Sequence, residues 1–259
     1  MAVYFAGDMH LRTDHPDRSE RLARWARRLA PDDSVYLVGD VCDFWFVARE
    51  QQGDPLRCPG LKALADFKAR GGDLTILSGN HDHWLGPLYR ERLGATFVEG
   101  PIDLDAHGLK IHTTHGHKVG GRPAWKSLME SRRFLDSFSA LPRGIARRLD
   151  VQLNTSNHLK RIHQEGRLLP YYHRYADKLD PATDLVVFGH IHTPCNNVER
   201  SPRLIILGSW HEESCYLKVD GQGAKLITER DAAEPAVSLT DAGSPPDSVR
   251  RIPADHGQI

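Results

Sequence analysis

The sequence lacks the features of secreted, membrane-spanning and nucleic-acid-coating proteins. Its 259 residues include four cysteines and no C-x-x-C pair, which excludes a disulfide framework and favours a reducing compartment. No apolar run approaches the ~18 residues of a spanning helix, and the short run from Met1 to Ala6 has no basic leader of the signal-peptide kind. The formal net charge of zero gives no general attraction to nucleic acid. We therefore expect a cytoplasmic protein with no nucleic-acid partner.

What the sequence does contain is a set of short polar clusters, most of which come directly after an apolar run. Their side chains are mainly those of Asp, Asn and His, a ligand set that suits hard-to-borderline divalent cations held side by side. Two cations about 3.5–4 Å apart are a known device for cleaving phosphate esters and anhydrides. The clusters are Asp8-Met9-His10, Gly39-Asp40-Val41-Cys42-Asp43, Gly79-Asn80-His81-Asp82, His115-Gly116-His117 and Gly189-His190-Ile191-His192.

Alternation of strand-like and helix-like segments predicts an α/β fold with a largely parallel sheet covered by helices. Helices are expected over 19–29 and 60–70, where apolar residues recur at helical spacing. Ligand sites in such sheets form at the carboxyl ends of strands, so we expect the polar clusters to meet there. The expected strands are 3–6, 34–38, 74–77, 109–113, 184–188, 204–207 and 215–219, with a turn at Asp220-Gly221.

The predicted core consists of residues 1–121 and 179–230, interrupted by a helical insertion over 122–178 and followed by a disordered tail over 231–259. The insertion contains twelve Lys and Arg against five Asp and Glu, although the whole chain is neutral. It also contains large apolar side chains. That combination favours an anionic or amphipathic substrate, or an anionic membrane surface. A solvated basic helix face that merely packs on the core is the plainer interpretation.

The clusters supply ligands for two cations. One cation would take Asp8, His10, Asp40 and His192. The other cation would share Asp40 and would also bind Asn80, His115 and His190. Each cation would keep an open position for water and phosphate. His81 would protonate the leaving oxygen as a general acid, with Asp82 orienting its ring.

The five clusters, in this order, resemble the motifs of the metallophosphoesterase (calcineurin-like) superfamily. That pattern is D-x-H, G-D-x-x-D, G-N-H-[DE], a later H-G, and G-H-x-H, and it spans residues 8 to 192 here. The resemblance implies a four-layer αββα sandwich with two divalent metal ions, often Mn²⁺, at the sheet edge. Fe²⁺, Co²⁺ and Zn²⁺ also suit Asp, Asn and His ligands. The resemblance also implies the ligand roles given above and the role of His81 in protonating the leaving group.

Within the superfamily, the chain resembles the bacterial UDP-2,3-diacylglucosamine pyrophosphatases of lipid A synthesis. The likeness rests on 36–45, on 134–148 and on Leu207-Gly208-Ser209-Trp210-His211. It implies a nucleotide-sugar lipid substrate, release of UMP and an acylated sugar 1-phosphate, and a lid formed by the insertion. The enzyme would then associate peripherally with the cytoplasmic face of the inner membrane. The substrate contacts expected in the insertion are Trp125, Arg143, Arg147, Arg148 and Lys160.

Two departures from this branch leave the substrate open. The usual third motif of the branch is G-N-R-D, whereas this chain has His81 in place of the arginine, and the segment 118–125 also differs. An arginine there would be a fixed cation, whereas a histidine can also transfer a proton. The chain is therefore a divergent member acting on the lipid, or a phosphatase or phosphodiesterase acting on a soluble nucleotide or another phosphoester. A non-catalytic scaffold would be expected to have lost ligands, which are all present here.

Overall fold

The computed structural model describes residues 1–12, 14–43, 54–121 and 166–230, together with Ser131, Ser137, Leu141, Pro142 and Ile145. Most of the predicted insertion and the whole predicted tail lie outside these residues. The four cysteines are described, and none of them forms a disulfide. Within the described part of the chain, no helix combines the length and apolar content needed to cross a membrane.

The first of two sheets has six strands in the order β11-β10-β1-β2-β3-β4. Its parallel part is formed by β1 to β4, and β10 and β11 extend it on the β1 side as an antiparallel hairpin. The strands β1, β2 and β3 are short, largely buried runs rich in Val, Leu, Ile and Phe, which is why they could be predicted from the sequence; the three-residue edge strand β4 was not predicted. The strands are β1 (Val3–Ala6), β2 (Ser34–Val38), β3 (Asp73–Leu77), β4 (Thr96–Val98), β10 (Glu213–Asp220) and β11 (Gly223–Arg230).

The second sheet has five strands in the order β5-β6-β7-β9-β8. Its centre, β6, β7 and β9, is parallel, and an antiparallel strand closes each edge. The two sheets face each other across a core that includes Phe5, Val38, Val187 and Leu217. The strands are β5 (Ile102–Ala106), β6 (Leu109–Thr114), β7 (Leu185–Phe188), β8 (Cys195–Asn197) and β9 (Arg203–Ile206).

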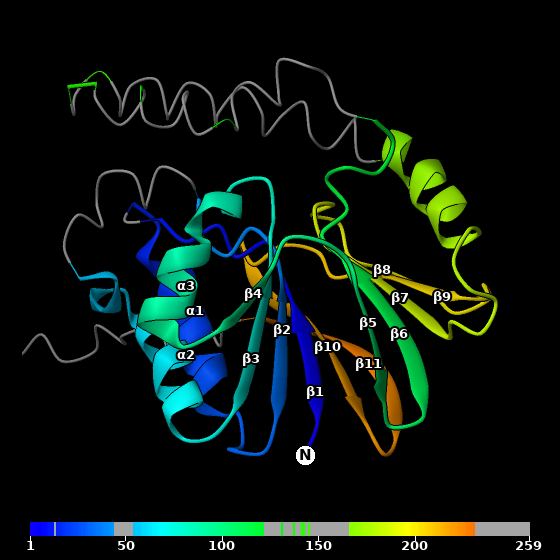
Figure 1. The fold of residues 1–259 in the computed structure, drawn as a ribbon, viewed down its shortest axis with the longest axis horizontal. Coiled ribbons are helices and arrows are strands. Elements are labelled where there is room, and N and C mark those ends of the chain that lie inside the picture. The colour runs from blue at the N-terminus through cyan, green and yellow to red at the C-terminus, as the bar shows by residue number, and fades with distance from the viewer. Residues whose placement is uncertain are drawn as a thin grey trace, which may run out of the picture.

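Helices cover the outer faces and complete the predicted αββα order of layers (Figure 1). The first sheet is covered by α1 (Pro16–Arg27), α2 (Pro59–Ala69) and α3 (Gly86–Leu93). Residues 166–176 are helical and cover the second sheet, where Tyr172 packs on Phe188 at 4.5 Å between ring centroids. The fold class predicted from the sequence, a four-layer α/β sandwich, is therefore confirmed. The helical lid lies largely outside the described residues.

Differences from the expected elements have local causes. Helix α1 begins at Pro16 rather than at residue 19, because proline fits the first helical turn, where no backbone donor is needed. The turn at Asp220-Gly221 joins β10 to β11, a strand that the sequence analysis did not identify. Helix α3 was also missed, since Gly86 and Pro87 at its start are typical of a loop.

Candidate metal centre

The five polar clusters lie at the carboxyl ends of β1, β2, β3, β6 and β7. Backbone hydrogen bonds join neighbouring loops: the Asp8 N–H donates to the Gly39 carbonyl over 3.1 Å, and the His10 N–H donates to the Asp40 carbonyl over 3.0 Å. In this way the fold brings together side chains as far apart in sequence as residues 8 and 192.

Several of the predicted ligands have unusual backbone conformations. Asp8, His10, Asp40 and His190 have φ values between 47° and 68°, a region that residues other than glycine seldom adopt. The one further non-glycine residue in this region among those described is His107, in the β5–β6 turn. Strained backbone of this kind tends to be retained at functional sites. Here it turns four donor side chains toward one centre.

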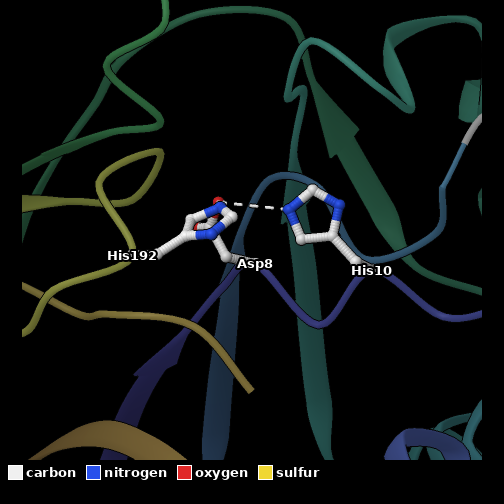
Figure 2. A group of neighbouring side chains, drawn as sticks. All are labelled: Asp8, His10 and His192. Carbon is white, nitrogen blue, oxygen red and sulfur yellow. Dashed lines mark ion pairs between the residues drawn. The ribbon is translucent and has the colours of Figure 1, made fainter. Parts of the chain in front are cut away.

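One group of donors is built around the Asp8 carboxylate. Its Oδ1 lies 3.8 Å from His10 Nε2 and 3.6 Å from His192 Nε2, and the three side chains could hold one cation between them. Figure 2 shows the two rings reaching the carboxylate from different loops. The other carboxylate oxygen, Oδ2, accepts the His190 backbone N–H over 2.8 Å, which fixes the side chain.

The second group of donors is built around the Asp40 carboxylate. Its Oδ2 lies 3.3 Å from His115 Nε2 and 3.8 Å from His10 Nε2, so Asp40 stands between the two groups. Asn80 Oδ1 is 3.3 Å from the same His115 nitrogen, and His190 completes a set that could hold a second cation. The other His115 nitrogen, Nδ1, is 2.8 Å from the Val38 carbonyl, which orients the ring with Nε2 toward Asp40.

The chemistry of this donor set fits divalent cations. Asp8 Oδ1 and His10 Nε2 are buried and have no hydrogen-bond partner among the described residues. Buried polar atoms are normally satisfied, so two such atoms facing each other indicate a missing ligand. Both belong to side-chain types that bind Mn²⁺, Fe²⁺, Co²⁺ and Zn²⁺.

The electrostatics of the site also favour cations. Burial alone would raise the pKa of Asp8 and of Asp40, but the neighbouring histidines outweigh it and lower both pKa values below the usual range. Burial lowers the pKa of His10 to about 4, so its ring is neutral near pH 7. Burial also acts to lower the pKa of His115, but Asp40 and Asp8 outweigh it and raise that pKa to about 10. Two buried carboxylates thus attract positive charge to this point.

His81 stands beside this centre and is held by a different residue from the one that we predicted. Its Nδ1 is 2.8 Å from Asp43 Oδ1, and its backbone N–H donates to Asp40 Oδ1 over 2.8 Å. Asp82, expected to orient the ring, is buried with its carboxylate engaged by the Gly79 N–H, the Val41 N–H and the Tyr89 hydroxyl at 2.8–3.0 Å. The assignment of Asp82 is therefore corrected.

The position of Asp82 has a structural consequence. Burial first, and then the Asp40 charge, raise the pKa of Asp82 to about 6. The carboxylate ties the loop after β3 to the loop after β2, since it accepts from both. We conclude that Asp82 supports the loops that carry Asp40 and Asn80.

Gly79 allows two of these loops to approach closely. A Cβ at this position would overlap the carboxylate and the amide of Asp40. We expect Gly79→Ala to displace Asp40 and to lower kcat/KM on a phosphodiester by about 10²-fold, the scale that misplacement by an ångström can cost. Gly221→Ala is the control, because a Cβ there meets nothing within 4 Å. Unchanged activity in Gly79→Ala would show that Asp40 does not need its present position.

The helix over 166–176 contacts the loop that carries His115. The Tyr172 hydroxyl donates to the Gly116 carbonyl over 3.2 Å, and its ring fills the space beside that glycine. Tyr172→Phe should lower the free energy of unfolding by about 1 kcal/mol, the usual net value of one hydrogen bond. Tyr171→Phe, whose side chain is exposed, should leave it unchanged in the same urea titration. Equal effects of the two substitutions would contradict a specific role of the Tyr172 hydroxyl.

The structure adds residues that the ligand assignment did not include. The His211 ring lies 4.9 Å from the His192 ring and 5.5 Å from the His10 ring, measured between centroids. His117 lies beside His115 at 5.2 Å. The segment of His211 was recognised in the sequence, but no spacing linked it to the metal ligands. The predicted substrate contacts lie outside the described residues; these are Trp125, Arg143, Arg147, Arg148 and Lys160.

Two stacked sheets with Asp, Asn and His donors at one edge are the arrangement that the metallophosphoesterase resemblance implied. The profile of the calcineurin-like phosphoesterases matches residues 1–194, and the chain belongs to this family. It is therefore a metal-dependent hydrolase of phosphoric esters or anhydrides, and its family implies divalent metal ions.

More particular similarities are to curated bacterial enzymes. The UDP-2,3-diacylglucosamine hydrolase of Aeromonas salmonicida is 26% identical over 243 residues, which cover 89% of this chain and 94% of that enzyme. The enzyme of the same name from Hahella chejuensis is 24% identical, with 88% and 97% covered. Among solved structures, an archaeal phosphodiesterase matches with a TM-score of 0.42 and 14% identity, over 88% of this chain and 99% of that one.

Proposed function

We propose that this protein hydrolyses the diphosphate of a UDP-2,3-diacylglucosamine-like lipid. Water would attack the phosphorus next to uridine, the bond to the sugar phosphate would break, and the products would be UMP and an acylated sugar 1-phosphate. The observation that carries the proposal is the extent of the similarity. The family profile stops at residue 194, whereas the Aeromonas salmonicida hydrolase aligns with 89% of the chain. The likeness therefore extends beyond the motifs that any phosphoesterase needs.

The proposed cofactor is a pair of divalent cations, most simply Mn²⁺. Asp8, His10 and His192 would hold one cation, and Asn80, His115 and His190 the other, with Asp40 shared. The sharing is supported by the position of Asp40 Oδ2, which lies within 3.8 Å of donor nitrogens in both groups. When bound, such a pair activates water as a nucleophile and neutralises charge on the phosphoryl oxygens.

The proposed role of His81 is to donate a proton to the leaving oxygen. Since Nδ1 faces Asp43, Nε2 is the ring nitrogen that would make this transfer. The Asp43 carboxylate is buried and orients the ring toward the centre, where the His10 ring lies 4.9 Å away between centroids. General acid catalysis needs this kind of fixed orientation.

The proposed organisation is a core over 1–121 and 179–230, with a lid over 122–178 that covers the acyl chains. The cationic excess of that segment, twelve Lys and Arg against five Asp and Glu, supports contact with phosphates and with an anionic bilayer. The enzyme would then act at the cytoplasmic face of the inner membrane.

Release of UMP tests the proposal directly. Purified protein with Mn²⁺ would be given UDP-2,3-diacylglucosamine in detergent micelles and, in parallel, UDP-N-acetylglucosamine, which has the same diphosphate and no ester-linked acyl chains. The lipid should be cleaved with the higher kcat/KM, because binding of the acyl chains contributes to catalysis. Sedimentation with anionic liposomes should also remove the protein from solution.

The opposite result is equally informative. Equal rates on the two substrates, or cleavage of simple phosphodiesters only, would favour a phosphodiesterase of soluble nucleotides or other phosphoesters. The substitution at His81 and the unusual segment 118–125 are the observations that keep this second function open. A protein that stays in solution with liposomes would support it further.

A further inference from the structure

A chain of charged side chains leads from His81 to the surface of the protein. His81 Nδ1 contacts Asp43 Oδ1 at 2.8 Å, and the other oxygen of Asp43 accepts from Arg12 Nη1 over 3.1 Å. Arg12 then uses Nε and Nη2 to bind both oxygens of Asp14, over 2.9 Å and 3.2 Å. The Arg12 side chain is 9% exposed and that of Asp43 6%, whereas that of Asp14 is 41% exposed. The chain thus runs from a buried site to solvent.

The backbone places Arg12 and Asp43 next to each other. The Leu11 N–H donates to the Val41 carbonyl over 3.0 Å, and the Asp43 N–H donates to the Leu11 carbonyl over 3.2 Å. The loops after β1 and β2 therefore run side by side, and backbone contacts alone determine which of their residues lie opposite each other. Arg12 follows two residues after the predicted ligand His10, and its guanidinium is a donor of hydrogen bonds rather than a metal ligand.

We propose that Arg12 is a positioning residue that holds Asp43, and through it His81, in the geometry for protonating the leaving group. This rests on the proposed role of His81 and is independent of the lipid substrate. A carboxylate bound through one oxygen can rotate, whereas Asp43 is bound at both. Arginine suits the task because its planar fork binds two carboxylates in one rigid orientation, which a lysine ammonium cannot do.

The contact between Arg12 and Asp43 affects His81 because the charged Asp43 carboxylate lies between them. Asp43 is a buried carboxylate that has Arg12 on one side and the His81 ring on the other. Without Arg12, Asp43 would keep its charge in a buried place with one partner fewer, and it would turn toward water or the remaining cationic groups. His81 would then lose its orienting acceptor, while the metal ligands would keep theirs.

Two uridine 5′-aryl phosphates allow the effect of Arg12 on proton donation to be measured separately from its effect on the rest of the site. The 4-nitrophenyl and phenyl esters differ in the basicity of the leaving oxygen, and the more basic phenolate depends more on proton donation. Arg12→Met should lower kcat on the phenyl ester about 10-fold or more and change kcat on the nitrophenyl ester less than about twofold, the pattern of a lost general acid. Arg12→Lys should show the same pattern to a smaller extent. Arg27→Met, an exposed arginine of α1, is the control.

A double mutant with His81→Gln distinguishes a positioning role of Arg12 from a general loss of structure. Adding Arg12→Met to His81→Gln should cost little more than His81→Gln alone, because the two residues act as one unit. Additive losses, or equal losses on both esters, would overturn the proposal, and an unchanged Arg12→Met enzyme would do so too. If wild type cleaves both esters but not the lipid, the proposed substrate fails while this inference stands.

A spectroscopic measurement gives a second, activity-independent answer. In ¹H–¹⁵N spectra of the zinc-loaded protein, the His81 Nδ1 proton should be visible because Asp43 protects it, and His81→Gln assigns the signal. In Arg12→Met and Arg12→Lys the signal should shift or exchange away, with metal content unchanged by mass spectrometry. An unshifted signal in both variants would refute the role of Arg12 even if one variant folds poorly.

Discussion

Asp40→Asn is expected to lower kcat/KM by about 10³-fold, since the cations that it would help to hold supply several kcal/mol of transition-state stabilisation. Asn keeps the shape of the side chain and an oxygen for the His81 backbone N–H, which now donates to Asp40 Oδ1 over 2.8 Å. What it removes is the negative charge between the two groups of donors. Metal content should therefore fall from about two ions per chain, as measured by mass spectrometry.

A matched control is available for this substitution. Asp33 is also a buried aspartate, and its oxygens accept the backbone N–H groups of Ala2 and Ala30 over 2.7 Å and 2.9 Å, away from the site. Asp33→Asn should lower stability through a lost acceptor and leave metal content and kcat unchanged. If Asp40→Asn retained two metals and full activity, the shared-ligand role of Asp40 would be wrong.

The sequence predicted the core strands because their physical signal is local. Ser34 to Val38 and Val3 to Ala6 are short apolar runs, as buried parallel strands are, and each is followed by a glycine or a polar residue where the chain turns. Given the strands, the meeting of the clusters follows from geometry, since parallel strands bring their carboxyl ends to one edge. The meeting of the clusters was therefore predictable before any distance was known.

What the sequence could not supply was the direction of individual side chains. Asp82 is next to His81 in the chain, so it was the natural candidate to orient the ring. The loop instead turns Asp82 inward to Tyr89 and the backbone, and Asp43 arrives from the neighbouring loop. Contacts between loops depend on the register of β2 against β3, which a single sequence does not specify.

The strand β11 was missed for a different reason. Its residues alternate between exposed and half-buried positions, as expected of an edge strand with one solvated face. A run such as Gly223 to Arg230 with two Lys or Arg and one Glu resembles a polar loop. The turn at Asp220-Gly221 was the available signal, because a tight turn after one strand predicts a second, antiparallel strand.

His81→Gln is the second substitution with a large expected effect. Loss of a general acid costs about 10²–10⁴-fold in rate, so kcat on the phenyl ester of uridine 5′-phosphate should fall by at least about 10²-fold. The nitrophenyl ester should be affected much less, because its leaving oxygen is a weaker base. Gln keeps the backbone N–H that donates to Asp40 Oδ1, so metal content should remain that of the wild type.

Two controls decide between proton donation and a metal-binding role of His81. His173→Gln, in the helix over 166–176 that covers the second sheet, should leave both esters unaffected. Asp43→Asn should reproduce part of the His81→Gln pattern, since it removes the charge that holds Nδ1 while leaving the ring in place. A fall in metal content in His81→Gln, with equal losses on both esters, would show that His81 acts as a ligand rather than as the proton donor.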